Sequence, residues 1–109
     1  MITTHVLDTL RGKAGSEIAV VLFKVEKTLA TEIASGITDS NGRLAITASD
    51  FNAVSGIYRL HFATSAYYAK QDIICLYPFV EITFNAQFPG HYHIPLILAP
   101  HGYSTYRGS

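Results

Sequence analysis

Short runs of apolar and β-branched residues, separated by turns rich in Gly, Pro, Asn and Asp, make up most of the chain. Runs of this length predict β-strands rather than helices. The clearest alternation lies in residues 56–62, where odd positions fall on one face of a strand and even positions on the other. The predicted strands span residues 2–8, 18–25, 29–38, 43–46, 56–62, 79–86, 91–98 and 103–107.

The segments between these runs predict turns and one helix. Asp39-Ser40-Asn41-Gly42 indicates a β-hairpin, because Asn-Gly supplies the positive φ angles of a two-residue loop. Residues 11–16 are expected to form a loop, and residues 87–90 a turn. A short helix is predicted over residues 65–71, with Ser65 as its N-cap. Seven to eight short strands with one brief helix favour an all-β, two-sheet β-sandwich forming a single domain over residues 1–109.

Composition and net charge limit the kinds of partner that the protein is expected to bind. Eight Lys and Arg balance eight Asp and Glu among the 109 residues, with no basic cluster, so nucleic acid and an anionic membrane surface are not expected as partners. Apolar residues make up 49% of the chain, more than so small a domain buries. The strand over residues 18–25 is apolar on both faces. An oligomer is therefore expected.

The single cysteine, Cys75, lies in an apolar run and is expected to be a small buried hydrophobe rather than a reactive thiol. No cationic segment followed by an apolar run indicates a signal peptide. No apolar run approaches the length of a membrane span. We expect a cytoplasmic protein in a reducing compartment.

Histidines supply the first candidate chemistry. His91 and His93 are two positions apart on a predicted strand, so both imidazoles project from one face. This spacing suits two metal ligands, and His5 is the obvious third if the first strand lies alongside. By itself, however, His-x-His is a weak metal signal, and a structural or catalytic use of the same nitrogens is favoured. His61 and His101 carry no supporting motif.

The C-terminal residues add hydroxyls and a guanidinium, in Tyr103-Ser104-Thr105-Tyr106-Arg107-Gly108-Ser109. No Gly-x-Ser-x-Gly segment occurs, and no Asp lies nearby, which disfavours a Ser-His-Asp nucleophile. The chain also lacks a Gly-rich phosphate loop and a paired-carboxylate motif. Nucleotide and glycosidic chemistry therefore have no support.

Two terminal segments carry a family resemblance. Thr3-Thr4-His5-Val6-Leu7-Asp8-Thr9 at the start, and residues 92–96 with 102–109 at the end, closely resemble the 5-hydroxyisourate hydrolases, transthyretin-related enzymes of urate breakdown. Residues 38–43 and 51–58 also match, so the resemblance covers nearly the whole chain. Its most specific part is the closing Tyr-Arg-Gly-Ser.

This resemblance implies a transthyretin-like sandwich assembled as a homotetramer, with active sites in the channel between dimers. It places catalytic roles on His5, Arg43 and His93, and substrate-binding roles on Ser104, Tyr106 and Ser109, with no metal or other cofactor. The chain departs from the family at Ala14-Gly15, where Pro-Ala is usual, and at His101, where Tyr is common. Neither position belongs to the catalytic set.

The implied reaction is hydrolysis of 5-hydroxyisourate, in which water opens a cyclic amide. Two histidines and an arginine can supply its base, its acid and its oxyanion donor. Which histidine acts as the base stays open at this point. A non-catalytic small-ligand carrier of the transthyretin type and a metal-binding protein using His5, His91 and His93 are the two alternatives.

Overall fold

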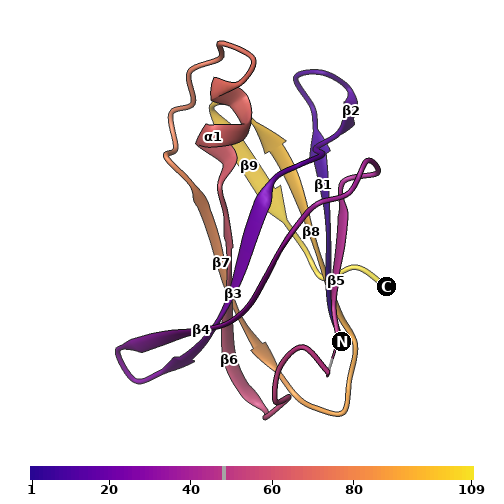
Figure 1. Ribbon diagram of the computed structural model, residues 1–109, viewed down its shortest axis with the longest axis vertical. Helices are drawn as coiled ribbons and strands as arrows, with labels where there is room; N and C mark the ends of the chain where they lie inside the picture. The colour runs from indigo at the N-terminus through magenta and orange to yellow at the C-terminus, as the bar shows by residue number, and fades with distance from the viewer. Residues whose placement is uncertain (48) are drawn as a thin grey trace.

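Two β-sheets pack face to face in the computed structural model, which describes residues 1–47 and 49–109 (Figure 1). The elements in chain order are β1 (Ile2–Asp8), β2 (Lys13–Ala14), β3 (Ala19–Glu26), β4 (Leu29–Ile37), β5 (Arg43–Ile46), β6 (Gly56–Phe62), α1 (Thr64–Ala69), β7 (Val80–Ala86), β8 (Tyr92–Ala99) and β9 (Gly102–Thr105). One sheet has the order β2-β1-β8-β9, with β5 also paired to β1, and the other has the order β4-β3-β6-β7.

This architecture confirms the all-β sandwich with one short helix. The strands follow the predicted runs closely, with one addition. Residues 11–16 were expected to be a loop, but β2 forms within them because Leu7 and Asp8 at the end of β1 offer partners to Ala14 and Lys13. The described residues therefore form nine strands rather than seven or eight.

Strand β1 lies at the centre of its sheet and runs parallel to β8 over its whole length, from Ile2 opposite Tyr92 to Asp8 opposite Leu98. Its side chains alternate strictly. Ile2, Thr4, Val6 and Asp8 are buried between the sheets, whereas the odd positions are half-buried on the outer face. Thr3 and His5 therefore project outward together.

The predicted hairpin at residues 39–42 is wrong, because the strands on either side of the turn do not pair with each other. A turn does form there, with the Gly42 amide donating to the Asp39 carbonyl at 2.9 Å and Gly42 at φ 75°. However, β4 pairs with β3, whereas β5 pairs with β1 in the opposite sheet. The Asn-Gly signal specified the turn, but the free edge of β1 determined where the returning strand paired.

The predicted cap of the helix is also wrong. Helix α1 begins at Thr64, its N-cap is Ala63, and no side chain caps it, so Ser65 lies inside the first turn. Tertiary contacts of Tyr67 and Tyr68 hold the helix instead of a local cap. With six residues, α1 is much too short to cross a bilayer, and the described part of the chain holds no helix that could.

Cys75 is half-buried and packs against the core, as expected for a structural cysteine. Burial raises the pKa of its thiol. A raised thiol pKa disfavours the thiolate, so the structure agrees with a packing role for this residue.

A buried carboxylate joins α1 to the end of β1. Asp8 is 1% exposed and accepts hydrogen bonds from the hydroxyls of Tyr67 at 2.7 Å and Tyr68 at 2.9 Å. It also accepts from the backbone amides of Leu10 and Arg11. Burial, together with the Asp8 carboxylate, raises the pKa of Tyr67 to about 12 and also raises that of Tyr68. Both phenols therefore stay protonated as donors.

We predict that Asp8→Asn lowers the free energy of unfolding by roughly 1–3 kcal/mol, the usual cost of a buried polar group left without its partner. The amide nitrogen of Asn cannot accept a hydrogen bond, so one buried tyrosine hydroxyl loses its acceptor. Urea denaturation measures the change. Asp72→Asn is the matched control, because Asp72 is exposed at φ 58°, a backbone conformation that Asn tolerates well. Equal stabilities for the two variants would contradict the prediction.

Candidate active site

The outer face of the sheet containing β1 brings the candidate residues into two neighbouring rows. Strand register pairs His5 with Arg43 on β5, and pairs Thr3 with His93 on β8. Residues paired across strands share a face and lie close enough for their side chains to interact. The sheet thus collects side chains from three strands that are distant in sequence.

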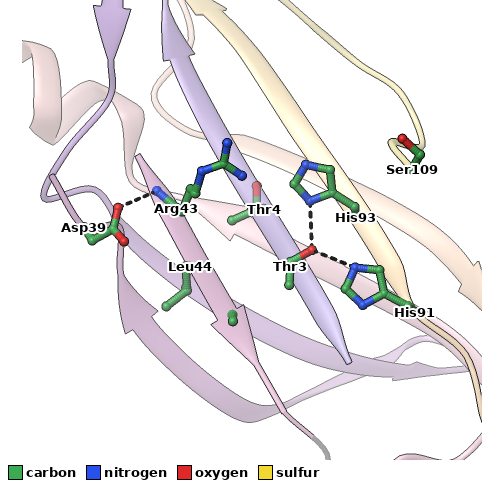
Figure 2. Close-up of a pocket in the computed structure, with 9 residues that line it drawn as sticks. Thr3, Thr4, Asp39, Arg43, Leu44, His91, His93 and Ser109 are labelled. Carbon is green, nitrogen blue, oxygen red and sulfur yellow. Dashed lines mark hydrogen bonds between the residues drawn. The ribbon is translucent and has the colours of Figure 1, made fainter. Parts of the chain in front are cut away.

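A cavity of about 370 Å³ opens on this face. Its size falls in the range of about 300–1,000 Å³ typical of small-molecule sites. Polar and titratable side chains are prominent in its lining, and Figure 2 shows them converging from β1, β5, β8 and the chain end. The lining residues are Thr3, Thr4, Asp39, Arg43, Leu44, Ala45, His91, His93 and Ser109.

The ring of His93 is held on two sides. Its Nδ1 lies 2.8 Å from the Thr3 hydroxyl oxygen, which is a short hydrogen bond. On another side the backbone of Gly108 packs against the ring so closely that a Cβ at position 108 would overlap its Cδ2 atom. The Gly108 amide also donates to the His93 carbonyl at 2.8 Å. These contacts leave the imidazole little freedom to rotate.

Arg107 fixes the last residues of the chain beside the site. Its guanidinium stacks over the Tyr92 ring at 4.3 Å from the ring centre, and its Nη2 donates to the His91 carbonyl at 3.2 Å. Gly108 then makes the close approach to His93, and Ser109 reaches the cavity. Each residue of the Arg-Gly-Ser ending therefore has a distinct structural contact.

Asp39 fixes the backbone from which Arg43 extends. Its Oδ1 accepts from the backbone amides of Arg43 and Asn41, both at 2.9 Å. The hydrogen bond from the Arg43 amide is the main reason that the pKa of Asp39 is lowered. Because the carboxylate bonds to backbone, the Arg43 guanidinium is left to extend toward His93 (Figure 2).

The environment of His93 favours its neutral form. Burial lowers the pKa of His93 below its usual 6.5, and the positive charge of Arg43 lowers it further, with smaller contributions from His5 and His91. A neutral imidazole can accept a proton at neutral pH. The site therefore combines a proton acceptor with a fixed cation and several hydroxyl groups.

The structure brings together Arg43, His93 and Ser109 from the predicted set. His5 lies next to Arg43 by register, although it is not among the residues lining the cavity. Ser104 lines a shallow second cavity with Ile97 and Thr9, and the Tyr106 side chain is 56% exposed. On the single chain, these last two residues do not reach the first cavity.

Sequence reasoning missed Thr3 and Asp39 as site residues, and it weighed a metal-binding use of His91 against a structural or catalytic one without placing His91 in the site. A signal for Thr3 was present, because it precedes His5 by two positions on the same strand and must share its face. For the metal hypothesis, residues 1–47 and 49–109 contain no group of three His, Cys, Asp or Glu side chains placed to hold an ion. His61 lies on the other sheet, where its Nδ1 is 2.9 Å from Glu81.

Fold and site together define a transthyretin-type β-sandwich with a histidine- and arginine-lined cavity on one outer face. A family model described as the HIUase/Transthyretin family matches residues 2–108. The chain belongs to this family.

Relatives with curated names point in the same direction. The chain is 41% identical to a probable 5-hydroxyisourate hydrolase of Caenorhabditis elegans, covering 99% of this chain and 80% of the relative. It is 40% identical to a probable 5-hydroxyisourate hydrolase of Schizosaccharomyces pombe, covering 99% and 90%.

Solved structures share the whole fold. A 5-hydroxyisourate hydrolase of Klebsiella pneumoniae superposes with a TM-score of 0.85 at 31% identity, covering 99% of this chain and 98% of the other. Sea bream transthyretin in complex with thyroxine superposes with a TM-score of 0.88 at 30% identity, covering 98% and 93%. The fold therefore does not separate the hydrolases from the carriers, and the side chains of the site must do so.

We predict that the imidazole of His93 titrates below its usual pKa of 6.5, and that Arg43→Gln moves the titration to higher pH. Removing a nearby positive charge makes protonation easier, which raises the pKa. NMR titration of the ring protons follows both proteins without any assay of activity. A midpoint that stays in place in Arg43→Gln would show that the guanidinium does not act on this ring.

Proposed function

We propose that this chain hydrolyses 5-hydroxyisourate, with water opening a cyclic amide, in urate degradation. The observation that carries the proposal is the convergence of His93, Arg43 and Ser109 on one cavity. The reaction needs a base for water, an acid for the departing nitrogen and a donor for the oxyanion. Hydrolase relatives that match nearly the entire chain support the same activity.

In the proposed mechanism His93 is the general base. Its pKa is lowered by burial and by Arg43, so the ring is neutral near pH 7 and can take the proton of the attacking water. Arg43 binds the flat substrate through paired hydrogen bonds and opposes the charge that develops on the carbonyl oxygen. His5, beside Arg43, protonates the departing nitrogen. Ser109, Ser104 and Tyr106 bind the substrate.

The alternative is a non-catalytic carrier, as in the sea bream transthyretin that was solved with thyroxine. A carrier site for an apolar ligand is expected to be lined mainly by apolar side chains. The cavity on this chain places two histidines, an arginine, an aspartate and hydroxyl groups beside Leu44 and Ala45. This composition favours the hydrolase.

The proposal extends to assembly and location: a homotetramer of single-domain chains, residues 1–109, in the cytoplasm. Several large apolar side chains stay exposed on the single chain, including Leu29 at 66%, Ile37 at 63% and Ile74 at 87%. Association would cover such surface. Because Ser104 and Tyr106 do not reach the cavity of their own chain, their proposed role also favours a site shared between chains. A single cysteine, half-buried, supports the reducing compartment.

We predict that sedimentation equilibrium at micromolar concentration gives the mass of four chains, compared with 11.9 kDa for one. A monomeric mass over the whole concentration range would contradict the proposed assembly. It would not by itself contradict the hydrolase activity.

We predict that His93→Asn and His5→Asn each lower turnover of freshly generated 5-hydroxyisourate by roughly a hundredfold to ten-thousandfold, as typical for loss of a proton-transfer group. Arg43→Lys is also expected to impair turnover severely, because Lys keeps the charge but loses the planar pair of donors. A spectrophotometric assay of folded variants of unchanged assembly measures the effects.

His61→Asn is the matched control, because His61 pairs with Glu81 on the other sheet. Its turnover is expected to stay near that of the wild type. Near-wild-type turnover of His93→Asn or His5→Asn would refute the two-histidine mechanism. Absence of any turnover by the wild type would refute the proposed function itself.

A further inference from the structure

The Thr3 hydroxyl lies between two imidazole rings, and the mechanism above does not use this arrangement. Its oxygen is 2.8 Å from Nδ1 of His93 and 3.4 Å from Nε2 of His91 (Figure 2). The first distance is a short hydrogen bond, and the second is a long one. Contacts of this kind often tighten only when substrate is bound.

A hydroxyl group has a single hydrogen, so it can donate to only one of the two rings and must accept from the other. The protonation of the two rings is therefore coupled. If Nε2 of His93 is free to take a proton from water, Nδ1 carries the hydrogen and donates it to Thr3. Thr3 then donates its own hydrogen to Nε2 of His91.

We propose that Thr3 is a positioning residue that orients His93 as the base. Through its hydroxyl, the proton that His93 gains is relayed to His91. This inference rests on the proposed function. As the water oxygen bonds to the substrate carbonyl carbon, Nε2 of His93 takes the proton that the water loses. The Nδ1 proton of His93 moves to the Thr3 oxygen, and the Thr3 hydroxyl proton moves to Nε2 of His91. His93 ends neutral and His91 becomes an imidazolium.

The surroundings suit a transfer in this direction. His91 is exposed to solvent, whereas His93 is half-buried beside the charge of Arg43. The hydrogen bond from Arg107 to the His91 carbonyl fixes the backbone that carries the receiving ring. Among the neighbouring groups, Arg43 and His5 also act on the pKa of His93, and Asp39 and Ser109 line the same cavity. Within the described residues, none of their side chains hydrogen bonds to Thr3 or to either ring.

The hydroxyl of the neighbouring Thr4 has a different partner from that of Thr3. Thr4 is buried, and its hydroxyl donates to the Ile94 carbonyl at 2.6 Å, a contact that stabilises the sheet. Thr3, one position earlier, bonds instead to the imidazole rings of His93 and His91.

The first test compares Thr3→Val, which removes the hydroxyl and keeps the β-branched shape, with Thr3→Ser, which keeps the hydroxyl. We expect Thr3→Val to lower kcat roughly tenfold to hundredfold with little change in KM, since a misplaced reacting group can cost about a hundredfold. Thr3→Ser is expected to retain most of the activity. Thr83→Val is the matched control, because that hydroxyl accepts from Arg59 on the other sheet. Unchanged kcat in Thr3→Val, or equal losses in the Val and Ser variants, would overturn the proposal.

The second test addresses the receiving ring. His91→Asn is expected to lower kcat, and imidazole added to the buffer is expected to restore part of it. The double variant Thr3→Val with His91→Asn is expected to be no slower than Thr3→Val alone, because both changes interrupt one path. Unchanged kcat in His91→Asn, or losses that multiply in the double variant, would overturn the transfer to His91.

A third measurement needs no turnover. Nitrogen-15 NMR of the neutral His93 ring is expected to find the hydrogen on Nδ1 in the wild type and a shift toward Nε2 in Thr3→Val. A wild-type ring with its hydrogen on Nε2 would overturn the proposal. If the wild type fails to turn over 5-hydroxyisourate, the proposed function is refuted. This measurement would still decide whether Thr3 determines which nitrogen of the His93 ring carries the hydrogen.

Discussion

The parallel pairing of β1 with β8 is the constraint on which the rest of the molecule depends. It joins residues about 90 positions apart in the sequence and places both strands at the centre of one sheet. The inner face of β1 supplies buried side chains to the core, and its last residue, Asp8, anchors α1. The outer face carries Thr3 and His5. A slip of one residue in this pairing would send both to the core and move every apolar partner outward.

The site on the outer face is held mainly by backbone contacts, which leaves its functional groups free. Asp39 binds the amide of Arg43 and not its guanidinium, and Arg107 binds the carbonyl of His91 and not its ring. His93 is the exception, since Thr3 occupies one of its ring nitrogens. The other nitrogen is the one available to a substrate. Rigid support with unoccupied reactive groups is what a preorganised site requires.

The sequence predicted the strands well, because period-two alternation is a local property that burial imposes on each strand separately. Residues 56–62 alternate as expected, with Tyr58, Leu60 and Phe62 buried. The partner of each strand was harder to predict than the strand itself. The sequence of the Asp39–Gly42 turn is compatible both with a next strand that returns to β4 and with one that crosses to β1. The proximity of His5, Arg43 and His93 could not be obtained from spacing at all. It came from the family resemblance, and the register of β1 with β5 and β8 explains it physically.

The contact between Gly108 and His93 has a consequence for how mutations are tolerated along the chain. Residues near a chain end usually accept substitution, because little packs against them. Gly108 is half-buried and its φ needs no glycine, so neither burial nor backbone conformation marks it as sensitive. Yet any side chain there would begin inside the space of the His93 ring. If every possible substitution were tested, position 108 should therefore accept as few other amino acids as a core residue does.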